Sequence, residues 1–319
     1  MNSQSISVII PLFSQEIYAR RAITGVVEQT LKPKELILVD DSLTPWIHEK
    51  YLTSISHYGF KVRYLRNETN LGSAASLNLG MSLSTSEILC MLNDDDFFAP
   101  NRLSEISRIS LSSDLGKFWG FSNVNLIDAY GAELSTSGIR SVDKAIAESR
   151  SRQLKFETLE SSNFAVSSGN LFLSKKLFEL GYGFDESLKH VQDWYLTQRL
   201  FLNSDPKILH DSTYYYRMHE SNTFRVINPK DTFLECEAIR KAIRAELWKT
   251  VDRERIFELL SYKVLDLSRE SSSVPNHVGV INGRAYTLVD FIISKLHKKK
   301  ILFSLITFVG RKFARFARF

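Results

Sequence analysis

The chain has 319 residues, and its 44% hydrophobic content is enough to bury the core of one large domain or two. Its two cysteines exclude a disulfide framework, and no Cys/His cluster has zinc-ligand spacing, so we expect a reducing cytoplasm. The net charge of +5 is modest, although basic residues crowd into positions 298–318.

The first 92 residues alternate β-branched apolar runs with segments of helical character. This alternation is typical of strand–helix–strand units in a mostly parallel sheet. The sequence therefore predicts an α/β fold of nucleotide-binding layout. The expected strands are 6–11, 36–39, 61–65 and 88–92, and the expected helices are 19–29, 46–56 and 71–83.

The second half of the chain is less regular. We expect a strand at 118–127, a hairpin or loop at 128–137, a mobile loop at 138–162, strand character at 164–172, and helices at 175–180 and 193–203. Helical spacing resumes at 232–248 and 255–267, followed by a Ser-, Pro- and Gly-containing linker at 271–282 and one or two final helices.

Neither end of the chain predicts export or membrane insertion. Residues 1–5 are polar and lead directly into an apolar run, without the basic and apolar stretches of a signal peptide. The longest apolar stretch, 301–309, is about half the length of a membrane span.

Polar side chains follow the predicted strands at their carboxyl ends, where open α/β sheets bind ligands. The most unusual is the run Asp94-Asp95-Asp96, because adjacent carboxylates repel one another and destabilise the fold unless a cation compensates. A divalent ion held by one or two carboxylates and by substrate phosphates would do so. A solvated acidic turn or helix N-cap is the alternative.

These motifs, taken in order, resemble those of the family-2 glycosyltransferases, an inverting group with the GT-A fold. Each motif is weak alone, but their order and spacing are specific over residues 5–225. The matching segments are Ile10 to Phe13, Gln29-Thr30, Pro33 to Glu35, Val39 to Ser42, Asn70 to Gly80, Asp94 to Pro100 with Arg102-Leu103, Ser168 to Phe172, Gly181 to Asp185, Gln192 to Trp194, and Tyr216 to Thr223.

The resemblance implies a GT-A catalytic domain over residues 1–227, with a mostly parallel central sheet flanked by helices. Its nucleotide-binding half would end near residue 115, and its acceptor-binding half would cover 116–227, with 138–162 as an acceptor-side insertion. Residues 228–319, which the resemblance does not cover, would form a helical C-terminal region.

The resemblance also implies a donor site and a metal site. Pro11 and Phe13 would line the nucleotide pocket, Asp41 would recognise the base, and a Mg²⁺ or Mn²⁺ ion would contact Asp95. The other residues expected around the donor are Asn70, Ser73, Asp94 and Arg217, and the other expected metal ligands are Asp96 and His219. Asn93 stands where relatives often carry Asp, which leaves the number of carboxylates on the metal open.

Asp193 matches the general base of the family, in a motif that is commonly Glu-Asp and here is Gln192-Asp193. An inverting transfer needs one carboxylate to take the proton of the attacking hydroxyl. A helix N-cap before Trp194 is the alternative, and both roles are compatible. Gly169, Asn170, Gln192 and Trp194 are expected near the donor sugar or the acceptor, with His190 as a further acceptor contact.

The basic residues of 298–319 alternate with phenylalanines, a pattern suited to an amphipathic helix on an anionic membrane. The alternative is a helix packed on the catalytic domain. No nucleic-acid-binding motif accompanies the charge. We therefore expect a cytoplasmic protein that contacts the inner face of the cell membrane and binds no nucleic acid.

The expected activity is transfer of a sugar from a nucleoside-diphosphate donor, a UDP- or dTDP-sugar, to a glycan or lipid-linked saccharide in cell-surface polysaccharide synthesis. Two alternatives remain at this point. A nucleotidyltransferase would need a glycine- and arginine-rich phosphate loop after the first strand, where 11–15 has none. A non-catalytic relative would bind a glycan or a partner without turnover.

Overall fold

The computed structural model describes residues 5–13, 15–45, 47, 49–111, 116–150, 162–222, 225 and 228–247. The chain divides into two compact units, 1–265 and 266–319, and the second lies outside the described residues. The predictions for 255–267, for the linker and for the basic tail therefore lie outside them too. The domain boundary after residue 227 stays a prediction.

The amino-terminal half forms parallel strands in the order β3-β2-β1-β4. Every strand and helix predicted up to residue 92 is present; β1, β2 and β4 are apolar runs buried on both sides of the sheet, whereas β3 is only half-buried beside β2. The elements are β1 (Ile6–Leu12), α1 (Glu16–Val27), β2 (Glu35–Asp40), α2 (Glu49–Ser56), β3 (Lys61–Arg66), α3 (Ser73–Leu83) and β4 (Ile88–Met91).

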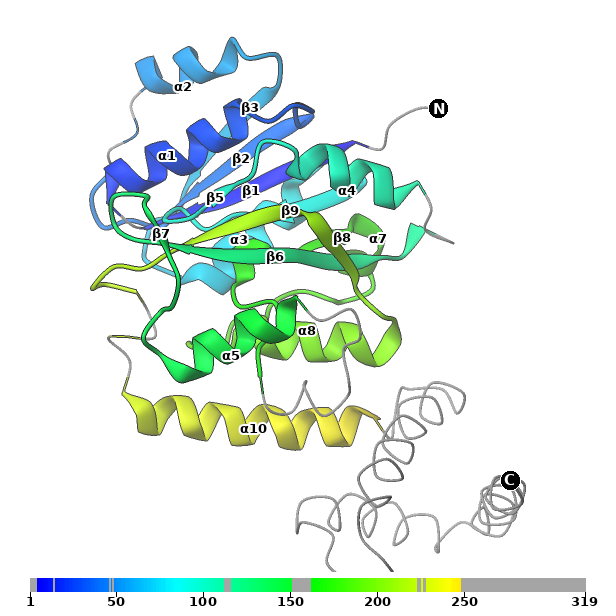
Figure 1. Ribbon diagram of the computed structural model, residues 1–319. Coiled ribbons are helices and arrows are strands. Elements are labelled where there is room, and N and C mark those ends of the chain that lie inside the picture. Colours follow the sequence, from blue (N-terminus) through cyan, green and yellow to red (C-terminus); the bar gives the residue numbers. More distant parts are fainter. Residues whose placement is uncertain are drawn as a thin grey trace, which may run out of the picture. The chain divides into compact units, whose positions relative to one another are not determined.

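The second half continues the same sheet in the order β4-β8-β6-β9-β5, with mixed pairing (Figure 1). β6 and β9 run parallel, whereas β8 and β5 are antiparallel to their neighbours. The short β7 (Glu133–Leu134) pairs with the end of β6, which confirms the predicted hairpin. The remaining elements are β5 (Phe97–Phe98), α4 (Arg102–Ser110), β6 (Trp119–Ile127), α5 (Arg140–Ser149), β8 (Phe172–Ser174), α7 (Lys175–Glu179), α8 (Gln192–Asn203), β9 (Lys207–Arg217) and α10 (Pro229–Leu247).

Three parts of the second half differ from the sequence prediction. The prediction of a mobile loop at 138–162 was wrong for α5 (Arg140–Ser149). Ala145 and Ile146 of this helix are buried on a face that packs on β6. The predicted strand at 164–172 is largely a turn, with a 3₁₀ segment at Ser168–Asn170 before β8. β9 was not predicted, because a register shift against β6 interrupts its alternation.

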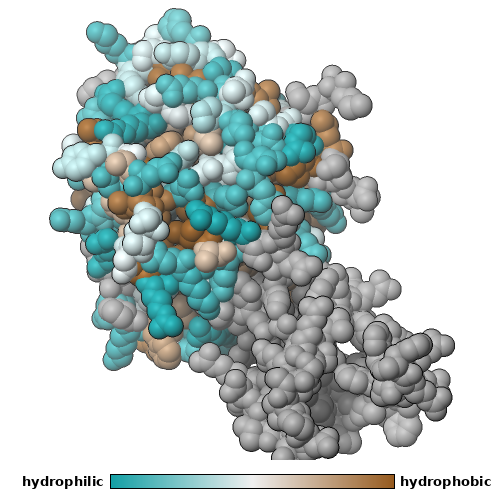
Figure 2. Space-filling model, viewed as in Figure 1, coloured by the Kyte–Doolittle hydropathy of each residue, from teal (hydrophilic) through white to brown (hydrophobic). Residues whose placement is uncertain are grey.

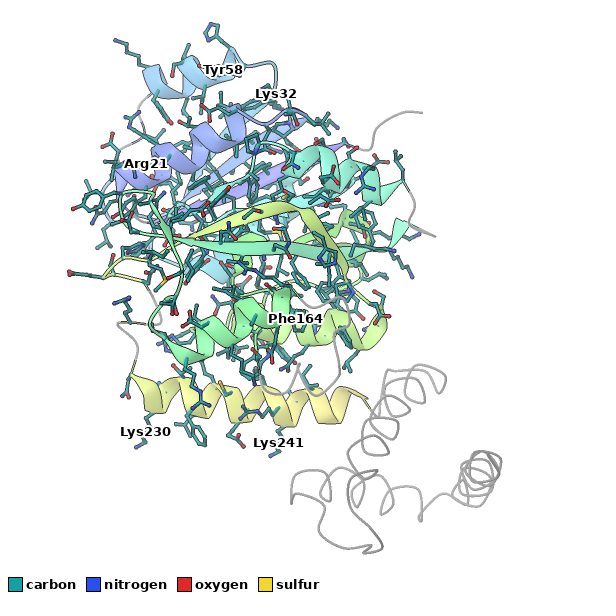
Figure 3. The ribbon with its side chains drawn as sticks, in the orientation of Figure 1. Arg21, Lys32, Tyr58, Phe164, Lys230 and Lys241 are labelled. Carbon is teal, nitrogen blue, oxygen red and sulfur yellow. The ribbon has the colours of Figure 1, made fainter. Side chains whose placement is uncertain are left out.

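α10 packs on α8, so the first helix after residue 227 lies against the part of the chain that carries Asp193. Ile239 is buried in a small cluster with Val191 and Trp194. Lys230 and Lys241 point away from the domain (Figure 3). No described helix combines the length and apolarity needed to cross a membrane. Figure 2 shows a described face that is mostly hydrophilic, with small separate hydrophobic groups.

The packing of α3 on β1 depends on Gly80. A Cβ added there would lie 2.3 Å from Cγ2 of the fully buried Ile9. Because Ile9 is β-branched and enclosed, it has little room to move away. The helix can therefore approach the sheet this closely only where it carries no side chain.

We predict that Gly80→Ala lowers the free energy of unfolding by about 1–3 kcal/mol, since overpacking outweighs the better helix propensity of alanine. Urea denaturation would measure this. Adding Ile9→Ala to Gly80→Ala should cost less than the sum of the two single changes. Unchanged stability of Gly80→Ala would contradict the close approach.

Candidate active site

The acidic run after β4 directs its three side chains to three different parts of the chain. Asp94 accepts a hydrogen bond at 2.6 Å from the backbone N–H of Phe13, in the loop after β1. Asp95 contacts His219, with 3.0 Å between carboxylate Oδ2 and imidazole Nε2. Asp96 turns toward β9. The turn therefore joins segments from both halves of the sheet.

Asp96 is fully buried, and both of its carboxylate oxygens have protein partners. The Tyr214 hydroxyl donates to Oδ2, and the backbone N–H of Arg217 donates to Oδ1 at 2.7 Å. Burial, with a smaller contribution from the nearby Asp95 charge, raises the pKa of Asp96 well above its usual range. The geometry thus ties Asp96, expected from the sequence to bind metal, to β9.

Asp95 and His219 keep a small accessible surface, with side chains 17% and 8% exposed. The other imidazole nitrogen, Nδ1, lies 2.9 Å from the Ser221 hydroxyl, and the His219 backbone N–H donates to Asn222 Oδ1 at 2.6 Å. Among the described residues, no three His, Cys, Asp or Glu side chains form a group that could hold a metal. Asp95 and His219 alone are nevertheless a donor set that Mg²⁺ or Mn²⁺ accepts when substrate phosphates complete the shell.

The predicted donor residues lie along the carboxyl edge of β1 and β2. Pro11 is buried inside β1, whereas Phe13 is 63% exposed. The buried Asp41 carboxylate shapes the loop before α3, because it accepts hydrogen bonds from Asn67 Nδ2 and from the backbone N–H groups of Leu71 and Gly72 at 2.7–2.8 Å.

Asn70 and Ser73, also predicted at the donor, are both exposed there. The Asn70 amide donates to the backbone carbonyl of Asp41 at 2.9 Å. Ser73 is the first residue of α3. The two side chains therefore lie at the same edge as Phe13.

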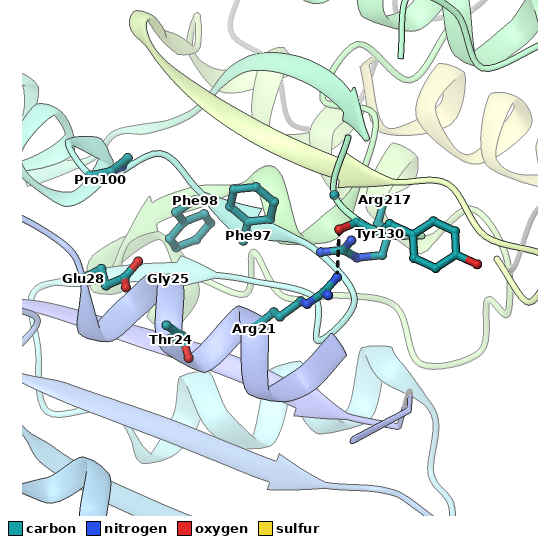
Figure 4. A pocket seen from close by; sticks show the side chains of 10 residues that line it. Arg21, Thr24, Gly25, Glu28, Phe97, Phe98, Pro100, Tyr130 and Arg217 are labelled. Atoms are coloured by element: carbon teal, nitrogen blue, oxygen red, sulfur yellow. Dashed lines mark hydrogen bonds between the residues drawn. The ribbon is translucent and has the colours of Figure 1, made fainter. Parts of the chain in front are cut away.

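Arg217 is only 1% exposed and is held by backbone carbonyls. Its Nε donates to the backbone carbonyl of Asp95 at 2.7 Å. Its Nη1 donates to the backbone carbonyls of Asp128 and Ala129 at 3.1 and 3.3 Å. Burial, and then the neighbouring Arg21, lower the pKa of Arg217. Its guanidinium borders a pocket of about 310 Å³ between α1 and residues 97–100, where Arg21 reaches the Tyr130 carbonyl (Figure 4).

Asp193 lies half-buried in the first turn of α8, where Val191 and not Asp193 is the N-cap. Its carboxylate accepts hydrogen bonds from Asn163 Nδ2 at 2.9 Å and from the Trp194 backbone N–H at 2.7 Å. Burial raises the pKa of Asp193 to about 6, against the smaller opposing effect of these bonds. Trp194 itself is only 7% exposed, and the side-chain oxygen of Gln192 is buried without a hydrogen-bond partner.

Gly169 and Asn170 build the turn before β8. A Cβ on Gly169 would lie 2.2 Å from the Tyr214 hydroxyl and 2.5 Å from the Asn93 nitrogen. The Asn170 amide is fully buried and bonds with Ser122 and with Ala165 O at 2.9–3.0 Å. Both residues therefore have structural contacts in place of an open surface.

Several residues that shape the site have no role assigned by the sequence motifs. Ser167 and Ser168 bond with the Asn93 amide at 2.8 and 2.9 Å, so Asn93 serves the turn that Gly169 occupies. Val166, just before them, has a φ of 69°, which is uncommon for a β-branched residue. Asn163 and Tyr214 carried no sequence signal beyond their nearness to predicted motifs.

We predict that Tyr214→Phe lowers the free energy of unfolding by about 1–3 kcal/mol, because a buried carboxylate oxygen of Asp96 loses its donor. Tyr215→Phe is the matched control, since the Tyr215 ring stacks on Phe97 and its hydroxyl bonds to no described residue. Urea unfolding of both variants would test this. Equal stability of the two variants would contradict the assignment.

Comparisons with known proteins agree with these motifs. Residues 7–108 match the family model described as glycosyl transferase family 2. An uncharacterized glycosyltransferase of Haemophilus influenzae is 24% identical over 279 residues, which cover 84% of this chain and 87% of that protein. The glycosyl transferase WcaA of Escherichia coli, whose name refers to colanic acid biosynthesis, is 34% identical over 104 residues, 32% of this chain and 37% of WcaA.

Solved structures share the fold. S. aureus TarS 1–349 in complex with UDP has a TM-score of 0.56 at 18% identity, covering 80% of this chain and 70% of that one. GalNAc-T7 with UDP, GalNAc and Mn²⁺ has a TM-score of 0.56 at 16% identity, covering 82% and 54%. The fold and the family resemblance predicted from the sequence are thereby confirmed. Residues 7–108 therefore carry the sequence signature of glycosyl transferase family 2, the chain has the GT-A fold, and the relative that it resembles over most of its length is a glycosyltransferase.

Proposed function

We propose that the chain is an inverting glycosyltransferase that moves a sugar from a nucleoside-diphosphate donor to a saccharide or lipid-linked saccharide acceptor. The observation that carries this proposal is that the carboxylates of the site have different positions and different partners. Asp94 and Asp95 serve the donor edge of the sheet, whereas Asp193 has the pKa of about 6 that suits a base.

The donor nucleotide would lie on the loop after β1. Phe13 offers an exposed aromatic ring, and Asp94 fixes its backbone. Flat bases stack favourably on such rings. UDP- or dTDP-sugars are the proposed donors, and the UDP and UDP-GlcNAc complexes of TarS support a nucleotide-sugar.

Asp95 and His219 would hold a divalent ion, Mg²⁺ or Mn²⁺. When bound, such an ion neutralises charge that develops on the leaving diphosphate. Asp96 and Arg217 then act indirectly, since Asp96 anchors the turn to β9 and Arg217 holds the Asp95 carbonyl. Asp41 likewise acts through the shape of the loop before α3.

Asp193 would take the proton of the attacking acceptor hydroxyl. With a pKa of about 6 it is ionised at neutral pH yet basic enough to accept that proton. Asn163 orients the carboxylate through one oxygen. Inversion follows if the hydroxyl attacks the anomeric carbon opposite the diphosphate.

The acceptor is proposed to be a cell-surface polysaccharide or its lipid-linked precursor. The name of WcaA, which refers to colanic acid biosynthesis, supports this class. A cytoplasmic location, with residues 298–319 on the inner face of the membrane, is proposed from the sequence pattern alone.

Incubation of the purified chain with Mn²⁺ and a panel of UDP- and dTDP-sugars should show saturable binding or slow hydrolysis of at least one donor. Asp95→Asn should weaken Mn²⁺-dependent donor binding more than about tenfold, measured by calorimetry. Asp211→Asn is the matched control, since that carboxylate is exposed on β9. Failure of the unaltered chain to bind any donor would overturn the proposal.

The base assignment predicts a pH profile. Because Asp193 must be deprotonated, kcat/KM should rise as pH increases through about 6 and level off above it, and activity should be lost as pH falls below that value. Asp193→Asn should slow transfer by about 10²–10⁴-fold with donor affinity unchanged. Near-normal transfer by Asp193→Asn would refute the assignment.

A further inference from the structure

One aromatic ring contacts both side chains that hold Asp95. Tyr18, in the first half of α1, stacks on His219 with 5.2 Å between ring centroids and 24° between planes. The guanidinium carbon of Arg217 lies 5.0 Å from the centroid of the same Tyr18 ring. His219 binds the Asp95 carboxylate, and Arg217 binds the Asp95 carbonyl.

Tyr18 contacts a part of His219 that its polar partners do not, namely the face of the imidazole. Ser221 contacts Nδ1, Asp95 and the Asn222 amide contact Nε2, and the Asn222 side-chain oxygen also accepts from the His219 backbone, so these contacts act on the ring nitrogens and the backbone. Stacking acts on the face of the imidazole and opposes its rotation away from Asp95. The Tyr18 hydroxyl bonds to no described residue, so the ring carries the effect.

We propose that Tyr18 is a positioning residue that preorganises Asp95 and His219 for a divalent ion. The inference rests on the proposed function, because it assigns a metal to this pair. α1 begins three residues after Phe13, whose backbone Asp94 holds. Tyr18 therefore also links the loop proposed to bind the nucleotide to the segment after β9 that carries His219.

Mn²⁺ affinity of the full chain in the presence of saturating UDP, whose phosphates complete the shell of the ion, tests this directly when the free ion is followed by electron paramagnetic resonance. Tyr18→Leu should weaken Mn²⁺ binding by about tenfold or more, as loss of a supporting contact does at metal sites. Tyr18→Phe keeps the ring and should bind within about twofold of the unaltered chain. Tyr58→Leu is the matched control, because Tyr58 is 51% exposed after α2.

Thermal unfolding separates positioning from general destabilisation. If Tyr18→Leu lowers the folded fraction, Tyr18→Met replaces it, since methionine adapts to irregular space. In a His219→Ala background, Tyr18→Leu should lower Mn²⁺ affinity by a smaller factor than in the unaltered chain, because only the contact of the ring with Arg217 remains; an equal loss in both backgrounds would show that the ring acts elsewhere and overturn the proposal.

The outcomes also distinguish this inference from the proposed function. Mn²⁺ binding that is lost in Asp95→Asn but normal in folded Tyr18→Leu would overturn the role of Tyr18 and leave the transferase standing. Donor binding without any Mn²⁺ binding by the unaltered chain would overturn the assignment of a metal to Asp95 and His219. The role of Tyr18 would then fall with it. Failure to bind either ligand would overturn the proposed function itself.

Discussion

The mutual repulsion of three adjacent carboxylates is the constraint on which this site depends. Asp94, Asp95 and Asp96 follow a strand that is buried on both faces; Asp94 and Asp96 are themselves buried, and Asp95 keeps only a small accessible surface. The fold separates them by giving each a different partner: a backbone N–H after β1, an imidazole after β9, and a hydroxyl with an N–H of β9. Each partner also belongs to a segment of the site. The contacts that reduce the repulsion are therefore the contacts that bring these segments together.

The surroundings of the acidic turn are fixed by neutral contacts and by a buried cation. Arg102 is fully buried; it donates to Asn170 O at 2.7 Å and to the Ser122 hydroxyl, and lies 4.6 Å from the centroid of the Phe98 ring. Burial lowers the pKa of Arg102. This cation links α4, β6 and the turn of Gly169, so the second half of the domain is held close to the acidic run without a direct ion pair among these contacts.

Much of the first half could be predicted from the sequence because β1, β2 and β4 are buried on both faces and their apolar runs are continuous. β9 and α5 escaped prediction for opposite reasons: a register shift interrupts one, and the other shows few apolar residues on a narrow face. The acidic run could be found, but the different roles of its members could not. Three identical side chains differ only in direction, and the partners that set this direction for Asp96 lie 118 and 121 positions away.

The long sequence separation between Asp96 and its donors means that residues 7–108, which carry the family signature, do not contain the whole site. β5 lies inside this stretch, yet its pairing partner β9 lies outside it, and so do both donors to Asp96. A chain ending near residue 108 would leave an edge strand unpaired and a buried carboxylate unsatisfied. The signature thus marks the most recognisable part of one cooperative unit, and its acidic turn can reach its final geometry only after β9 has been synthesised and has docked.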